Sequence, residues 1–369
     1  MLFGGLGPFG GSELRAWRLA RSGAVGGLGT VSMIGFDVGQ PARQMRDGLL
    51  HLRDHTQTLG ASRWRRWRGY AARRWRETLV CRRPSTMAWE TDAWARADAD
   101  VYVTFGVTAY SAKLAWWSKA HGKRCLLMLG SEMDLDPGEP DAATVYENVT
   151  MVVAQTTYQQ QEVQARYGRS SQLLRNPVVI PDLAPDRQRG GVLWVGKSNG
   201  IKRPGLMVDV ARLMPEHSFT LVMNKAEAVV DAAVRRELPA NVRVIDSVVP
   251  HEMGQLYSEA VALVSTSCIE GFANTFLEAA AHQTPVVSMV SDPDGFLSKH
   301  GCGVLTGESP AAVAAALRGL VAGDGGMSPE GQLMGHNGRR YVLRWHSAAA
   351  IEAEFAKLVV DCADGAGET

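Results

Sequence analysis

Short apolar runs with β-strand composition alternate with helical segments along most of this chain, and this alternation constrains the fold more than any other feature. Runs at residues 101–105, 192–195, 219–223 and 242–245 are each followed by a segment with helical periodicity. A strand–helix–strand repeat makes successive strands parallel, because the helix returns the chain to the same edge of the sheet. Such crossovers are right-handed. The sequence therefore predicts an α/β protein with doubly wound parallel sheets.

A polar, proline-containing stretch at residues 176–190 interrupts the alternation, which then restarts. With 369 residues, the chain is long enough for two domains of ordinary size. We expect two Rossmann-like domains facing a cleft, the first at residues 1–178 and the second at 190–337. A final helical stretch at about 338–360 lies in a C-terminal segment, residues 338–369.

Composition narrows the class of protein. A hydrophobic content of 46%, a charged content of 21% and a net charge of +1 fit a globular protein without a general affinity for nucleic acid. The five cysteines are scattered and lack metal-site spacing, which favours a reducing compartment over a disulfide framework. No run of 18 apolar residues is present, and a signal peptide is not expected. A cytoplasmic location is therefore predicted.

Residues 270–288 carry the clearest candidate site. Glu270 follows an apolar run at 260–266, and Glu278 comes eight residues later, inside an alanine-rich helix predicted from about residue 274 to 283. Open α/β sheets bind ligands at the carboxyl ends of their strands, and the N–H groups at a helix start suit phosphate or sugar oxygens. The Glu278 carboxylate could accept hydrogen bonds from a vicinal diol such as a ribose.

Two phosphate-binding patterns elsewhere are rejected on physical grounds. Residues 191–198 match the Walker A pattern, but 192–195 is itself the strand, and the next helix begins only near Pro204. Residues 5–10 match G-x-G-x-x-G, but only four residues precede the motif and Pro8 interrupts its turn. We interpret the first segment as a strand and loop whose lysines face a diphosphate, with two ordinary exposed lysines as the alternative.

The spacing of Glu270 and Glu278 resembles the E-x7-E motif of retaining glycosyltransferases of the GT-B fold, of the family 4 type (group 1). The resemblance covers most of the chain and includes residues 157–161, 167–168, 174–178, 196–197, 202–204 and 339–345. It implies transfer of a hexose from a nucleoside diphosphate sugar to a hydroxyl, with retained anomeric configuration and without a metal or other cofactor. It also implies that the C-terminal helices pack back on the first domain.

The resemblance also assigns roles to individual residues. The implied catalytic residues are Glu270, Lys202 and Lys197. The implied donor-binding residues are Gly196, Gly271, Phe272, Ala273, Asn274, Thr275 and Glu278. Gly10 and Gly11 would face the donor diphosphate and the acceptor. Many relatives carry a histidine after the strand at 124–129, where this chain has an acidic turn, so Glu132 and Asp134 are predicted on the acceptor side.

A basic aromatic segment at residues 62–83 contains nine arginines and three tryptophans. Arginine-rich faces with tryptophan anchors favour anionic membrane surfaces. We therefore expect peripheral docking on the cytoplasmic membrane, a lipid-linked or saccharide acceptor, and a role in cell-envelope or exopolysaccharide synthesis. The alternatives are an ordinary solvated helix or a nucleic-acid patch.

Two other functions remain open from the sequence. The first is a non-catalytic nucleotide-sugar-binding protein, which the short first strand and the missing histidine favour. The second is a nucleotide-sugar isomerase of the same fold. Turnover without an acceptor would indicate the isomerase, and donor binding without turnover would indicate the binding protein.

Overall fold

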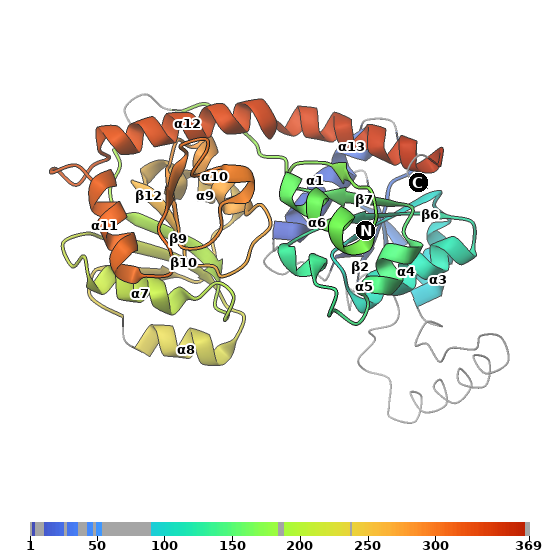
Figure 1. Ribbon diagram of the computed structural model, residues 1–369, viewed down its shortest axis with the longest axis horizontal. Helices are drawn as coiled ribbons and strands as arrows, with labels where there is room; N and C mark the ends of the chain where they lie inside the picture. Colours follow the sequence, from blue (N-terminus) through green and yellow to red (C-terminus); the bar gives the residue numbers. More distant parts are fainter. Residues whose placement is uncertain are drawn as a thin grey trace.

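The computed structural model describes residues 2–3, 11–25, 28–35, 43–46, 49–53, 90–183, 188–236 and 238–365, and the structural statements below concern these residues. Figure 1 shows two α/β bodies side by side, with the last two helices extending along both. Gly10 and the basic aromatic segment at 62–83 lie outside the described residues. Within the described ranges, no helix combines the length and apolar character that a membrane span requires.

The second body contains a six-stranded sheet in which all neighbouring strands are parallel. Its strands are β9 (Val192–Lys197), β10 (Phe219–Asn224), β11 (Val242–Ile245), β12 (Ala262–Ser265), β13 (Val286–Ser288) and β14 (Gly303–Leu305). Their order is β11-β10-β9-β12-β13-β14, so the chain winds outward from β9 and then returns to place β12 on its other side. This is a Rossmann-type order with its switch point between β9 and β12.

Helices cover both faces of this sheet. They are α7 (Pro204–Arg212), α8 (Ala228–Arg236), α9 (Pro250–Glu259), α10 (Asn274–Ala281) and α11 (Pro310–Leu320). Trp194 packs in a buried cluster with α7 and α11, whereas its neighbour Leu193 packs with α9 and α10. Burial on both faces explains why the strands are continuous apolar runs. Since β9 fills residues 192–197, the Walker A match is a strand, as expected.

The described part of the first body contains two four-stranded sheets. One is fully parallel, has the order β5-β6-β7-β8, and consists of β5 (Val101–Phe105), β6 (Arg124–Met128), β7 (Met151–Ala154) and β8 (Gln172–Leu173). The other has the order β1-β2-β4-β3, with β1 (Leu2–Phe3), β2 (Ser32–Gly35), β3 (Arg43–Arg46) and β4 (Leu49–Arg53). The antiparallel pairing of β3 with β4 was not predicted from the sequence.

The first body has these helices in its described part: α1 (Gly11–Val25), α3 (Glu90–Ala97), α4 (Ala109–Ala120), η2 (Glu132–Leu135), α5 (Ala142–Asn148) and α6 (Thr157–Tyr167). Gly11, predicted in a phosphate-facing loop, is the first residue of α1. Trp94, Tyr102 and Trp117 pack together at the core, with ring centroids about 5.5 Å apart. The prediction of two doubly wound α/β bodies is confirmed.

The last helices connect the two bodies. The helical stretch predicted at 338–360 is two helices, α12 (Pro329–Trp345) and α13 (Ala348–Ala363). The break falls where the chain pairs with another segment, since Val178 N donates to His346 O at 2.9 Å and Val178 forms a β-bridge with Ser347. α12 lies along α10 (Figure 1), whereas Phe355 of α13 belongs to the same buried cluster as Leu126 of β6. The chain therefore passes from the first body to the second near Val178 and returns near His346 and Ser347, and these two connections lie side by side.

Gly335→Ala is expected to destabilise the protein, because a methyl group here would lie 2.2 Å from the carbonyl oxygen of Gln283. Moving α12 to relieve this overlap should cost about 1–3 kcal/mol. Gly205→Ala in α7 is the control, since nothing lies within 4 Å of its added methyl group. The control should gain up to about 1 kcal/mol from helix propensity. Urea unfolding measures both free energies, and a Gly335→Ala variant as stable as the wild type would contradict this packing.

Candidate functional site

The loop after β9 lies at the switch point of the six-stranded sheet, and hydrogen bonds fix its shape. Ser198 N donates to Asn224 O at 2.9 Å, and Ser198 Oγ accepts from Ala226 N at 2.9 Å. These bonds tie the start of the loop to the end of β10. Lys202 N donates to Asn199 Oδ1 at 2.9 Å and closes the loop on itself. The backbone that carries Lys202 is therefore held at both ends of the loop.

Thr266, directly after β12, joins this loop to the neighbouring strand end. Its hydroxyl donates to Lys202 O at 2.6 Å and accepts from Trp194 Nε1 at 3.0 Å, and its carbonyl accepts from Arg203 Nε at 2.6 Å. These contacts hold Arg203 at a φ of 49°. Left-handed backbone at a non-glycine residue costs about 1–3 kcal/mol and persists only where its surroundings impose it. Thr266 therefore positions Lys202, although no sequence signal identified it.

Lys202 and Glu270, two of the implied catalytic residues, form an ion pair at the carboxyl edge of the sheet through Lys202 Nζ and Glu270 Oε1. Only 26% and 14% of these side chains are exposed, so the pair is largely shielded from solvent. Lys197, the last residue of β9, is exposed. Gly196 before it leaves room for the Trp194 ring, since an added methyl group would lie 2.7 Å from that ring. A shielded cation beside two strand ends can interact strongly with an anionic ligand.

Residues 271–274, called the donor loop below, lead from Glu270 into α10. The Phe272 ring is 3% exposed and packs against Phe296 and His346, with centroids 5.6 and 4.9 Å away. The ring is therefore part of the core, and a donor contact by Phe272 is limited to its backbone. Ala273 is the N-cap of α10 and supplies no side-chain capping bond. Asn274 and Thr275 are half-buried in the first turn.

Glu278 lies just over one turn into α10, where Tyr257 Oη donates to its Oε2 at 2.9 Å. Burial raises the pKa of Glu278, and the Tyr257 hydrogen bond and the positive charge of Arg18 partly offset this increase. Arg18 lies on α1, so the first body contributes to the electrostatics of this carboxylate. A carboxylate with one donor retains capacity to accept further hydrogen bonds from ligand hydroxyls.

Asp134 has a structural role beside the predicted acceptor contact. It is 8% exposed, and its carboxylate accepts from Val107 N, Gly130 N and Ser131 N at 2.7, 2.6 and 3.0 Å. Three backbone donors occupy most of the acceptor sites of this carboxylate. Asp134 therefore fixes the turn between β6 and η2, and its contact with an acceptor stays a prediction.

Glu132, the first residue of η2, is half-exposed and remains a candidate on the acceptor side. Burial raises its pKa, and the negative charges of Glu162 and Glu270 raise it further. Glu132 lies in the first body and Glu270 in the second, so carboxylates from both bodies contribute to the charge here. A polar molecule bound between them would meet hydrogen-bond acceptors from both bodies.

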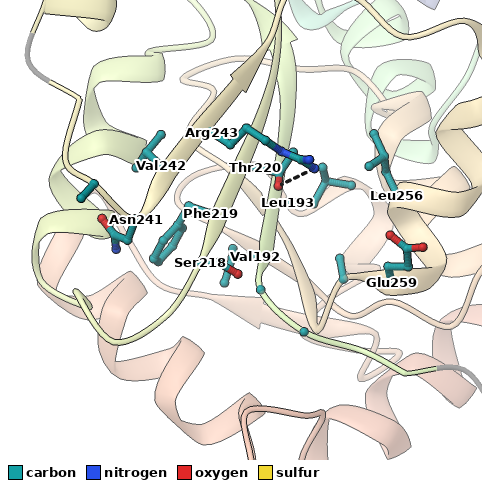
Figure 2. Close-up of a pocket in the computed structure, with 14 residues that line it drawn as sticks. Val192, Leu193, Ser218, Phe219, Thr220, Asn241, Val242, Arg243, Leu256 and Glu259 are labelled. Carbon is teal, nitrogen blue, oxygen red and sulfur yellow. Dashed lines mark hydrogen bonds between the residues drawn. The ribbon is translucent and has the colours of Figure 1, made fainter.

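Figure 2 shows a pocket of about 390 Å³ at a different place in the second body. Val192, Phe219 and Val242 line it, and these are the first residues of β9, β10 and β11. The pocket therefore lies at the amino edge of the sheet, opposite Lys202 and Glu270. Arg243 Nη2 donates to Thr220 Oγ1 at 3.4 Å across it. None of the predicted site residues lines this pocket.

Comparison with known families finds a match in the second body. Residues 190–323 match the family model described as glycosyl transferases group 1. This range includes Lys202, Glu270 and Glu278, so the ion pair and the carboxylate on α10 lie within the matched residues. A search of curated proteins finds no match to the sequence.

Solved structures of similar shape include HepE from Anabaena in complex with UDP and glucose, with a TM-score of 0.73, 15% identity, and coverage of 98% of this chain and 99% of that one. Sucrose-phosphate synthase from Thermosynechococcus elongatus has a TM-score of 0.72, 16% identity, and coverage of 95% and 92%. TarM has a TM-score of 0.57 and 16% identity over 70% of this chain, which spans 54% of TarM. At these identities the likeness establishes the fold, which is GT-B, as predicted.

Tyr257→Phe is expected to raise the pKa of Glu278 further, because it removes a hydrogen bond that stabilises the charged carboxylate. Nucleoside diphosphate affinity should fall about fivefold, the equivalent of one hydrogen bond of about 1 kcal/mol. The loss of binding on acidification should also begin at a higher pH. Calorimetric titration across pH measures both effects. Tyr102→Phe, which removes a 2.7 Å bond to Trp94 O in the first body, is the control. An unshifted pH profile in Tyr257→Phe would contradict the coupling.

Proposed function

We propose that this chain is a glycosyltransferase that moves a sugar from a nucleoside diphosphate donor to a hydroxyl of a saccharide or lipid-linked acceptor. The observation that carries the proposal is the Lys202–Glu270 ion pair at the switch point, with Glu278 on the helix that follows, inside the region that matches the group 1 glycosyl transferase model. Open α/β sheets bind their ligands at such points. HepE, with UDP and glucose in its structure, has the same fold and supports a nucleotide sugar as the donor.

In the proposed division of labour, residues 190–337 bind the donor, residues 1–178 bind the acceptor, and residues 338–369 couple the two. The bond from the anomeric carbon to the diphosphate oxygen breaks, and a bond from the acceptor oxygen forms on the same face, which retains the configuration. The acceptor proton passes to the departing diphosphate, so atoms and charge balance. Lys202, Lys197 and the first N–H groups of α10 would stabilise the charge that develops on the diphosphate.

The Lys202–Glu270 ion pair suggests how donor binding changes this site. A diphosphate that recruits Lys202 competes with Glu270 for the same ammonium group. Glu270 would then be free to accept hydrogen bonds from the transferred sugar, while Glu278 accepts from the ribose. The backbone N–H groups of Gly271 and Ala273 would bind sugar hydroxyls. Glu132 would accept a hydrogen bond from the acceptor.

Two further parts of the proposal come from the sequence. An anionic cytoplasmic membrane is a proposed partner through residues 62–83, which fits an envelope or exopolysaccharide product. The binding-protein and isomerase alternatives differ from the transferase in their turnover. A transferase consumes the donor only with an acceptor, or slowly by hydrolysis, and its product carries the acceptor oxygen.

Thermal shift against a panel of nucleoside diphosphates and their sugars is expected to select one sugar nucleotide. Lys202→Ala should weaken its binding about 10-fold to 100-fold, since a hydrogen bond to a charged group contributes about 1.5–3 kcal/mol. Lys123→Ala is a matched control, because it breaks a 3.0 Å ion pair with Asp98 in the first body. A panel with no shift, or equal losses in both variants, would argue against the donor site.

Removal of divalent metal is expected to leave turnover unchanged, because Lys202 and Lys197 supply the positive charge that a metal provides in other sites. The measurement is the initial rate after dialysis against EDTA, with and without added Mg²⁺. Proton NMR of the product reports the anomeric configuration in the same reaction. A rate that Mg²⁺ restores would overturn the metal-independent proposal, and an inverted product would overturn retention.

A further inference from the structure

A buried side-chain amide connects the two bodies beside the donor loop. Asn176 lies between the bodies along the chain and is 3% exposed. Its Nδ2 lies 2.8 Å from Phe272 O, 2.8 Å from Gln155 Oε1 and 3.1 Å from Asn274 Oδ1. The amide therefore bonds to the first body and to both the backbone and a side chain of the donor loop.

The orientation of these amides follows from one backbone group. Phe272 O can only accept, so the atom of Asn176 that faces it must be the donor Nδ2. The Gln155 atom facing Nδ2 must then be its acceptor, Oε1. Gln155 Nε2 consequently points towards Gly271, where an added methyl group would lie 2.3 Å from it. Gln155 is 1% exposed, so this arrangement is locked within the core.

Gly271 is required for space and not for its backbone conformation. Its φ lies outside the left-handed range in which glycine is favoured. Besides Gln155 Nε2, an added methyl group at Gly271 would lie 3.1 Å from Gly130 O, also in the first body. At the residue next to Glu270, the first body therefore leaves no space for a side chain.

The backbone of Asn176 is fixed as firmly as its side chain. His346 Nδ1 lies 2.8 Å from Asn176 O, and burial lowers the pKa of His346 to about 3, so the ring is neutral. A neutral ring facing a carbonyl carries its proton on Nδ1 and donates it. His346, in the segment that returns to the first body, therefore fixes the position of Asn176, and Asn176 in turn fixes the position of the donor loop.

We propose that Asn176, supported by Gln155, is a positioning residue that sets the donor loop against the transferred sugar. Neither side chain is assigned a contact with the reacting atoms. The inference rests on the proposed function, because it assumes that the donor loop binds the sugar while Glu278 binds the nucleoside. It adds a selective consequence: disturbing Asn176 should weaken recognition of the sugar and leave recognition of the nucleoside diphosphate nearly intact.

Asn176→Asp tests this selectivity because it preserves the shape of the side chain and turns a donor into a third acceptor facing Phe272 O and Gln155 Oε1. The probes are the sugar nucleotide that stabilises the wild type most and its nucleoside diphosphate, each titrated by calorimetry. We expect about a tenfold loss of affinity for the sugar nucleotide and less than about a twofold loss for the nucleoside diphosphate. The turnover number should fall together with the affinity for the sugar nucleotide.

Asn241→Asp is the matched control. Asn241 Nδ2 donates to three carbonyl oxygens, those of Ala211, Met214 and His217, at 2.9–3.0 Å. It lies at the amino edge of the sheet, beside the pocket of Figure 2. The same substitution there removes the same type of bonds, so it should lower stability without changing the ratio of the two affinities.

The outcomes separate the inference from the proposed function. The positioning role is overturned if Asn176→Asp weakens the binding of both ligands equally. It is also overturned if Asn241→Asp changes the ratio of the two affinities in the same way. In both cases the donor site stands. A wild type that binds neither ligand overturns both. If Asn176→Asp does not fold, Gln155→Ala and Gly271→Ala replace it. Gly271→Ala should reduce the turnover number more than about tenfold. The double variant of Gln155→Ala and Gly271→Ala should lose no more turnover than Gly271→Ala alone. Additive losses of turnover in the double variant would show that Gln155 and Gly271 do not act through contact with each other.

Discussion

The order of the six-stranded sheet is the constraint on which the candidate site depends. β9 and β12 are neighbours in the sheet, but their connections lead away to opposite sides, so the loops at their carboxyl ends lie beside each other. Thr266 fastens these loops through Lys202 O and Arg203 Nε. The ion pair of Lys202 with Glu270 therefore joins two segments that are far apart in sequence, and it depends on strand order more than on local propensity.

The first body completes this site. Arg15 of α1 is 4% exposed and donates to Leu129 O and Leu174 O at 3.0 and 2.9 Å, which anchors α1 at the carboxyl end of β6. Burial lowers the pKa of Arg15 to about 9, so it remains charged at neutral pH. On another part of the boundary, Thr157 N donates to Asp294 Oδ1 at 2.9 Å. The Thr157 hydroxyl donates to the same carboxylate at 2.6 Å, so Asp294 of the second body caps the start of α6 in the first body.

The sequence predicted the second body well, because its strands are continuous apolar runs buried on both faces and its helices begin at marked residues such as Pro204 and Pro310. The approximate locations of Lys202, Glu270 and Glu278 followed from the same periodicity. The pairing of β3 with β4 was missed, since β3 consists of two arginines, a glutamine and a methionine and has no apolar run.

Residues whose roles depend on distant partners could not be predicted. Thr266, Tyr257 and Asn176 act through contacts with segments 21 to 96 residues away, and none belongs to a motif that indicates such a role. The structural role of Asp134 was also missed, because an acidic turn at a strand end fits both a ligand contact and a cap. The three backbone N–H groups that this carboxylate binds come together only in the folded chain.

The most direct test is to find at which edge of the six-stranded sheet a nucleotide binds. Hydrogen–deuterium exchange, with and without a saturating nucleoside diphosphate, compares the two edges of the same sheet. We predict protection from exchange in residues 196–203 and 270–282, which surround Lys202, Glu270 and Glu278. Protection of residues 218–220 and 240–243 instead, at the pocket of Figure 2, would contradict it.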